Sequence, residues 1–127
     1  MSTGRLYTLG KSERLKSRKQ IDEIFKSGKK ITLFPFRLLY QTTQEKGEVR
    51  AGFTVSSKNF ARAVDRNRIK RLSREAYRLQ KKEIESVVLK NDYSLQLFFI
   101  YTGRDIPGFE EVSTSLKKLL DKLVKVL

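Results

Sequence analysis

The sequence predicts a single α+β domain, a sandwich of helices packed on a mixed β-sheet. Its 127 residues match the usual length of one domain, and no internal repeat or Pro/Gly-rich linker divides them. Stretches of alternating hydropathy, typical of strands, lie between stretches whose apolar residues recur every three or four positions, typical of helices. The expected order is α-β-β-α-β-α, with room for a short extra strand around Ile31. Nothing periodic in residues 1–13 predicts an ordered element there.

The first helix is predicted from about Ser17 to Lys26. Ser17 and Gln20 have the spacing of a capping box, and Gly28 suits the C-terminal cap. The apolar stripe that would face the sheet consists of Ile21, Ile24 and Phe25.

Two strands are predicted next, over Ile31–Gln41 and Val49–Ser57, because apolar and polar residues alternate in both. Pro35 in the first strand implies an edge position or a bulge, since proline cannot donate a ladder hydrogen bond. The stretch between them, Thr42–Glu48, is polar and contains Gly47. We therefore expect the two strands to pair as a hairpin.

Two helices and a strand complete the expected fold. A long helix is predicted from about Ala61 to Glu83, and Ser94–Thr102 is a nearly continuous apolar run, typical of a central strand covered on both faces. After a loop at residues 104–108, the last helix begins near Phe109. Its apolar face would comprise Val112, Leu116, Leu119, Leu123 and Val126.

The charge is large and concentrated. The formal net charge is +14, and Lys58–Lys82 holds more than half of it, with ten basic and two acidic residues, whereas a surface selected for solubility scatters both signs. The chain has no Cys and no His, which removes thiolate zinc sites and the commonest general acid and base. Because no apolar run approaches the roughly 20 residues that span a bilayer and the N-terminus lacks a signal-peptide pattern, we expect a cytoplasmic protein without membrane contact. This composition favours a binder of polyanions over a free-standing enzyme.

The predicted long helix has two opposed faces. Its apolar sector comprises Ile69, Leu72, Ala76 and Leu79. The opposite sector carries a cation at every fourth position, namely Arg66, Lys70, Arg74 and Arg78. Asn67 and Lys81 lie in the same sector. This row spans about 18 Å, and its uniform charge favours the phosphates of a folded RNA over the base edges of DNA. A solvated charged face is the alternative, although few acidic neighbours would stabilise it.

The same region carries a strand-then-helix motif centred on Arg66-Asn67-Arg68-Ile69-Lys70-Arg71. It follows Gly52-Phe53-Thr54-Val55-Ser56-Ser57-Lys58 and Arg62-Ala63-Val64, and it precedes Leu72-Ser73-Arg74-Glu75-Ala76-Tyr77-Arg78. With these residues the chain, from about Arg14 to Leu123, resembles the protein subunit of bacterial ribonuclease P.

The resemblance implies an α-β-β-β-α-β-α fold like one domain of a ribosomal protein. It also implies a left-handed βαβ crossover, whereas the general rule favours a right-handed one in about 98% of cases. It implies that one protein joins one catalytic RNA, which removes the 5′ leader from precursor tRNA. The protein would bind the leader and improve the affinity for substrate and Mg²⁺. The chemistry would belong to Mg²⁺ bound by the RNA, so we expect no catalytic residue, metal or cofactor on the protein.

The resemblance further implies two RNA-binding surfaces. The first faces the catalytic RNA and comprises Arg66, Asn67, Arg68, Lys70, Arg71, Arg74 and Arg78. The second is a cleft between the first helix and the sheet that holds the single-stranded leader, with Ile21, Phe25, Phe36, Tyr40, Ser57, Lys58 and Arg62. Stacking on aromatic rings suits a leader of any sequence, although Phe25 and Tyr40 could instead belong to the core. Ile21 departs from the Phe frequent at its position in the family, and Ala61-Arg62 departs from a Gly-Asn pair.

Two other classes of function are open. A structural RNA-binding protein of ribosomal type would bind folded RNA without changing any cleavage rate. A nuclease with its own metal site would need converging carboxylates. The pairs Asp22–Glu23 and Glu110–Glu111 do not meet this need, because adjacent residues on a helix point about 100° apart.

Overall fold

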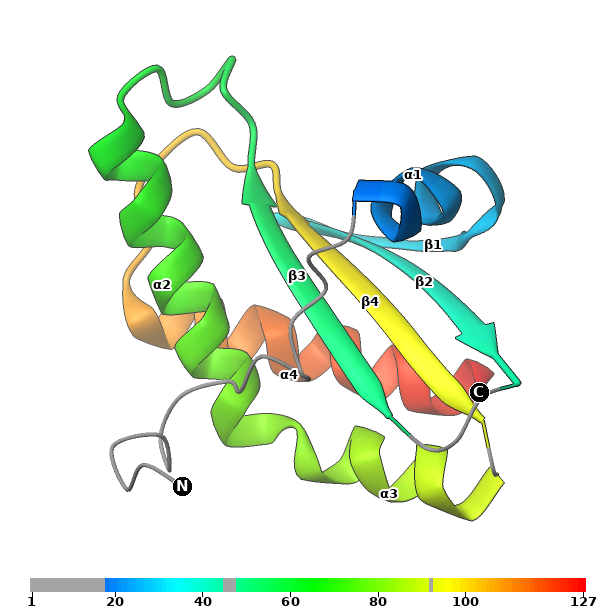
Figure 1. The fold of residues 1–127 in the computed structure, drawn as a ribbon. Coiled ribbons are helices and arrows are strands. Elements are labelled where there is room, and N and C mark those ends of the chain that lie inside the picture. The colour runs from blue at the N-terminus through cyan, green and yellow to red at the C-terminus, as the bar shows by residue number, and fades with distance from the viewer. Residues whose placement is uncertain (1–17, 45–47, 92) are drawn as a thin grey trace, which may run out of the picture.

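The computed structural model describes residues 18–44, 48–91 and 93–127 (Figure 1). Within these ranges no helix has the length and apolar character needed to cross a membrane. Along the chain the elements are α1 (Arg18–Ser27), β1 (Lys29–Leu33), β2 (Phe36–Thr43), β3 (Val49–Val55), α2 (Ala63–Gln80), α3 (Lys82–Asn91), β4 (Ser94–Tyr101) and α4 (Phe109–Val126).

The strands form one mixed sheet in the order β1-β2-β4-β3. β4 pairs antiparallel with β2, from Phe36↔Tyr101 to Thr43↔Ser94, and parallel with β3 on its other side. The predicted hairpin between the second and third strands is therefore wrong, because β4 lies between them. β2 instead forms a hairpin with β1, which confirms the short strand around Ile31. Pro35 lies in the turn of this hairpin, outside both strands, and so neither at an edge position nor in a bulge.

The sheet carries a core on each face, because side chains of a strand alternate between the two faces. α2, α3 and α4 close over one face, where Leu97 and Phe99 of β4 are fully buried (Figure 1). α1 lies on the other face, where Ile24 packs with Leu39 and Phe98. Nearly every residue of β4 is buried, which confirms the prediction of a central strand covered on both faces.

The predicted long helix is in fact two helices. α2 ends at Gln80, and α3 follows it with its own buried residues, Ile84 and Val88. The buried face of α2 consists of Ile69, Ser73, Ala76 and Tyr77, whereas Leu79, predicted in the apolar sector, is 57% exposed. Ser73 tolerates burial because its hydroxyl donates to the Ile69 carbonyl oxygen at 2.8 Å.

The glycine predicted to end the first helix is confirmed, whereas one residue predicted on the apolar face of the last helix is exposed. Gly28 follows α1 as expected, and a Cβ there would lie 2.5 Å from the Ile24 carbonyl oxygen, so glycine is needed where the chain turns into β1. The capping role of Ser17 lies outside the described residues. In α4, Val126 is 59% exposed and Leu120 is buried in the core instead.

The left-handed crossover and the likeness to a ribosomal protein domain stay predictions.

We expect Phe99→Ala to lower the free energy of unfolding by about 3–5 kcal/mol, the usual range for a buried phenylalanine. Phe99 is fully buried, with its ring stacked on Phe53 at 5.1 Å and 5.7 Å from the ring of Tyr77. Leu89→Ala is the control, because Leu89 is 69% exposed and its loss should change the free energy by less than about 0.5 kcal/mol. Urea denaturation measures both, and equal losses would contradict this description of the core.

Candidate nucleic-acid interface

The residues predicted to face the catalytic RNA all lie on α2, but their side chains are exposed to solvent to different extents. Asn67, Arg68 and Arg71 are exposed, whereas Lys70 and Arg74 are half-buried. The exposed residues lie opposite the buried face that packs on the sheet. Their side chains can therefore reach a large ligand without any rearrangement of the core.

Arg66 has a structural role that the sequence did not predict. Its Nη1 donates to the carbonyl oxygens of Phe60 and Ala61, both at 2.8 Å. These carbonyls belong to the loop that enters α2, and the N-cap residue, Arg62, makes no side-chain capping hydrogen bond. Arg66 thus ties the loop to the first turns of the helix.

Arg78 lies at the far end of the predicted row and is held within the protein. Its side chain is only 11% exposed, and its guanidinium is paired with the carboxylate of Glu75. The Arg74 Nε donates to the Lys70 carbonyl oxygen at 3.4 Å. The row at every fourth position is therefore not uniform, and Arg68 and Arg71 present the most accessible cations of the motif.

The loop between β3 and α2 extends the basic surface. It carries Ser57, Lys58 and Arg62, all exposed, and Arg62 lies 3.8 Å from the carboxylate of Asp65. Asn59 holds this loop against the end of β4, since its Nδ2 donates to the carbonyl oxygens of Thr102 and Gly103, each at 3.2 Å. The loop therefore presents its cations from a fixed position at the end of β3 (Figure 1).

On the opposite face of the sheet, α1 presents an open aromatic ring. Phe25 is 55% exposed and packs edge-to-face on Phe98, with ring centroids 5.5 Å apart. Ile21 is half-buried against the same apolar cluster. One ring of this cluster is thus available to a base, while the rest of the cluster supports it.

Phe36 and Tyr40 do not reach this surface, which corrects their predicted place in the cleft. They are 1% and 7% exposed and belong to the core beneath α2 and α4, where the ring of Phe36 packs on Tyr101 at 5.4 Å. In β2 they alternate with Leu39 and Gln41, whose side chains share the face of α1. Once α1 is known to cover Leu39, strand alternation shows that Arg37, Leu39 and Gln41 project to the face of α1, whereas Phe36 and Tyr40 do not.

Two carboxylates lie within the basic surface, Asp65 beside Arg62 and Glu75 paired with Arg78. Among the described residues, no three His, Cys, Asp or Glu side chains gather closely enough to hold a metal ion. Glu110 and Glu111 lie in the first turn of α4, beside a hollow lined by Tyr101 and Asp105. Burial, together with the carboxylates of Glu111 and Asp105, raises the pKa of Tyr101 above its ordinary value.

The comparisons with known proteins agree with one another. A family model described as Ribonuclease P matches residues 9–124. The ribonuclease P protein component of Porphyromonas gingivalis is 34% identical over 125 residues, which cover 97% of this chain and 91% of the relative. That of Chlorobaculum tepidum is 32% identical over 135 residues, covering 98% and 88%.

Solved structures share the fold. The RNase P protein from Thermotoga maritima matches with a TM-score of 0.68 and 27% identity, covering 87% of this chain and 96% of that one. The Staphylococcus aureus RNase P protein matches with a TM-score of 0.73 and 24% identity, covering 89% and 96%. On the family model and these relatives, the chain belongs to the ribonuclease P protein family.

Proposed function

We propose that this chain docks on a ribonuclease P RNA through α2 and holds the 5′ leader of precursor tRNA against α1, one protein to each RNA, in the cytoplasm. The RNA, with its bound Mg²⁺, carries the cleavage chemistry. The protein contributes binding energy, and none of its residues takes part in bond breaking.

The observation that carries this proposal is the exposed cationic surface of α2. Asn67, Arg68 and Arg71 project from one helix, and Lys58 and Arg62, which the resemblance assigns to the leader cleft, continue this exposed surface from the loop before it. A guanidinium can hold two phosphate oxygens at once, and a folded RNA presents phosphates at nearly regular intervals. Few carboxylates lie among these cations to neutralise them, so phosphates of the RNA are their natural partners.

The same cations explain how the protein would improve Mg²⁺ affinity. Bringing a precursor tRNA against a catalytic RNA places many phosphates close together, and their repulsion opposes binding. Protein cations at the contact reduce that repulsion, so fewer metal ions are needed to screen it. The protein should therefore stimulate cleavage most at low Mg²⁺.

Phe25 supports the second half of the proposal. Its ring is exposed on one side and supported by Phe98 on the other. A base that stacks on such a ring gains about 1–3 kcal/mol whatever its identity, which suits leaders of differing sequence.

The deciding experiment measures 5′ cleavage of a precursor tRNA by bacterial ribonuclease P RNA at low Mg²⁺, with and without the protein. Stimulation that requires the RNA is the expected result. Tight RNA binding without stimulation would favour a structural RNA-binding protein of ribosomal type. Cleavage by the protein alone would overturn the proposed division of labour.

Replacing Arg68 and Arg71 together by Ala should weaken binding to the catalytic RNA and make it less dependent on salt. Each lost phosphate contact reduces the slope of log K against log salt by roughly 0.9, so the pair should remove up to about 2. Binding titrations from low to moderate salt measure this slope. Lys122→Ala with Lys125→Ala is the matched control, since both lie exposed on α4. An equal loss of slope in the control would mean that α2 has no special role.

Phe25→Ala should weaken binding of leader-bearing precursor tRNA by the holoenzyme by about 1–3 kcal/mol, the value of one stacked base, and leave mature tRNA unaffected. Phe34→Ala is the control, because Phe34 is 76% exposed but lies in the turn between β1 and β2. Binding of both RNAs to both variants gives the comparison. Equal losses for precursor and mature tRNA would assign Phe25 to structure alone.

A further inference from the structure

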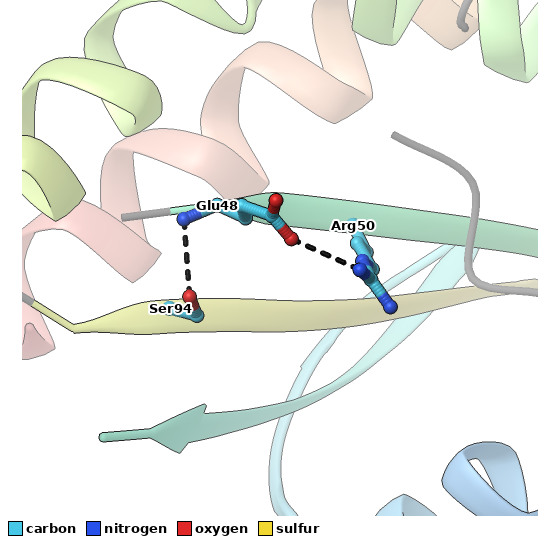
Figure 2. A network of polar contacts seen from close by, with 3 residues as sticks. All are labelled: Glu48, Arg50 and Ser94. Atoms are coloured by element: carbon cyan, nitrogen blue, oxygen red, sulfur yellow. Dashed lines mark hydrogen bonds and ion pairs between the residues drawn. The ribbon is translucent and has the colours of Figure 1, made fainter. Parts of the chain in front are cut away.

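Arginine side chains hold the chain at both ends of β3. At its start, the Arg50 Nη2 donates to the Glu48 carboxylate at 3.0 Å, and the Glu48 backbone N–H donates to Ser94 Oγ, also at 3.0 Å (Figure 2). Beyond its end, Arg66 donates to the backbone of residues 56–62, which we call the entry loop because it leads into α2. Both arginines therefore use the guanidinium to join neighbouring parts of the chain.

The Arg66 side chain reaches back from the start of α2 to the entry loop. Its Nη1 carries two hydrogens, and the carbonyl oxygens of Phe60 and Ala61 accept from this nitrogen, both at 2.8 Å. Arg66 is half-buried, whereas Arg68 and Arg71 are exposed. To bind a phosphate through this nitrogen, Arg66 would have to release the loop.

The entry loop depends on this contact because its last residue does not cap α2 with its side chain. Arg62 is the N-cap residue, and it makes no side-chain capping hydrogen bond. Residues such as Ser, Asp and Asn serve best at this position, since a side-chain oxygen can accept from the free N–H groups of the first turn. The Arg66 backbone N–H donates to the Arg62 carbonyl oxygen at 3.3 Å, so backbone and side chain of one residue both join the helix to the loop.

Other contacts hold the middle of the entry loop on the sheet. The Asn59 Nδ2 donates to the carbonyl oxygens of Thr102 and Gly103, each at 3.2 Å. Phe60 is 6% exposed, and its backbone N–H donates to the Ser56 carbonyl oxygen at 3.2 Å. The middle of the loop is thus fixed at the end of the sheet, and the arginine fixes its junction with α2.

The entry loop carries two exposed cations, Lys58 and Arg62, one on each side of these contacts. The Arg62 side chain is 75% exposed and lies 3.8 Å from the Asp65 carboxylate. The path of the loop backbone therefore sets where both charges lie. Groups that are already in place before binding lose less conformational entropy when the ligand arrives, so a well-held loop binds more tightly.

We propose that Arg66 is a positioning residue, which holds the entry loop so that Lys58 and Arg62 meet the leader of precursor tRNA, and that it does not itself bind a phosphate of the catalytic RNA. This inference rests on the proposed function, since it assumes that the loop cations contact the leader. It separates Arg66 from Arg68 and Arg71, although all three belong to one contiguous motif.

The test compares two binding steps of one holoenzyme. The first is assembly of the protein with a bacterial ribonuclease P RNA, and the second is binding of precursor tRNA to the assembled holoenzyme, with mature tRNA measured beside it. Arg66→Lys keeps the charge but loses the planar fork that reaches both carbonyls. It should leave assembly and mature tRNA binding unchanged and weaken precursor binding by about threefold to tenfold, the cost of ordering a side chain on binding.

A double-mutant cycle distinguishes positioning from a direct contact of Arg66 with the leader. Lys58→Ala should weaken precursor binding by the wild-type protein, and it should weaken binding less in the Arg66→Lys protein, where the loop no longer holds Lys58 in place. Arg68→Lys replaces Arg66→Lys in the control cycle. Its effect and that of Lys58→Ala should add, because Arg68 is exposed on α2 and does not hold the loop.

Asn59→Ala tests the loop without changing any cation. It removes the hydrogen bonds to the end of β4, so it should weaken precursor binding and leave assembly unchanged, as Arg66→Lys does. Arg104→Lys makes the same exchange of cations at another exposed position and should change neither step. Exchange of the Phe60 amide hydrogen should be faster in both loop variants, and urea denaturation should show both fully folded under the binding conditions.

Each outcome supports or contradicts the inference. Weaker assembly of the Arg66→Lys protein with unchanged precursor binding would show that Arg66 binds the catalytic RNA directly. Additive losses from Arg66→Lys and Lys58→Ala, or no loss in either step, would also overturn the inference and leave the proposed function standing. Absence of any stimulation of cleavage by the wild-type protein would instead overturn the proposed function itself.

Discussion

The pairing of β4 with two different neighbours determines most of this structure. It runs antiparallel to β2 and parallel to β3, and its side chains supply the core on both faces of the sheet. Two adjacent parallel strands cannot be joined by a tight turn, so the chain after β3 must leave the sheet and return over one face. That crossover is α2 and α3, and it includes the most basic segment of the sequence, Lys58–Lys82. The strand order thus places the cations on an outer helix beside an edge strand.

The two faces of the sheet differ in a way that suits two kinds of RNA contact. The face under α2 and α4 is closed by apolar side chains, and only the outer side of α2 meets solvent, with cations such as Arg68 and Arg71. The face under α1 has a small apolar cluster, on which the exposed ring of Phe25 packs. Phosphates are recognised by charge and bases by stacking and hydrogen bonds, so the surfaces proposed for docking and for leader binding lie on opposite sides of one sheet.

Most helices and strands could be predicted from the sequence. The main wrong predictions concern contacts between segments that are far apart in the chain or joined by a loop. Helices, strands and the buried central strand follow from local periodicity, and the motif at Arg66–Arg71 is contiguous, so both are visible in one chain. The partner of β2 is not a local property, and the predicted hairpin with β3 failed because the better partner, β4, comes some fifty residues later. Alternation likewise shows that Phe36 and Tyr40 share a face, but not which face α1 covers. The carbonyl partners of Arg66 depend on the path of a loop, which no spacing rule describes.

The features assigned to RNA binding are also those that stabilise the free protein least. Arg68 and Arg71 lie exposed among other cations that repel them, and the Phe25 side chain is 55% exposed. A ligand that binds these groups only in the folded state offsets this cost, because its binding stabilises the folded state. The two surfaces should then respond differently to solution conditions, since contacts to phosphate weaken with salt, whereas stacking and hydrogen bonds to a base do so far less. Raising the salt concentration should therefore weaken the proposed docking of α2 on the catalytic RNA more than the proposed stacking of the leader on α1, so salt separates the two contributions.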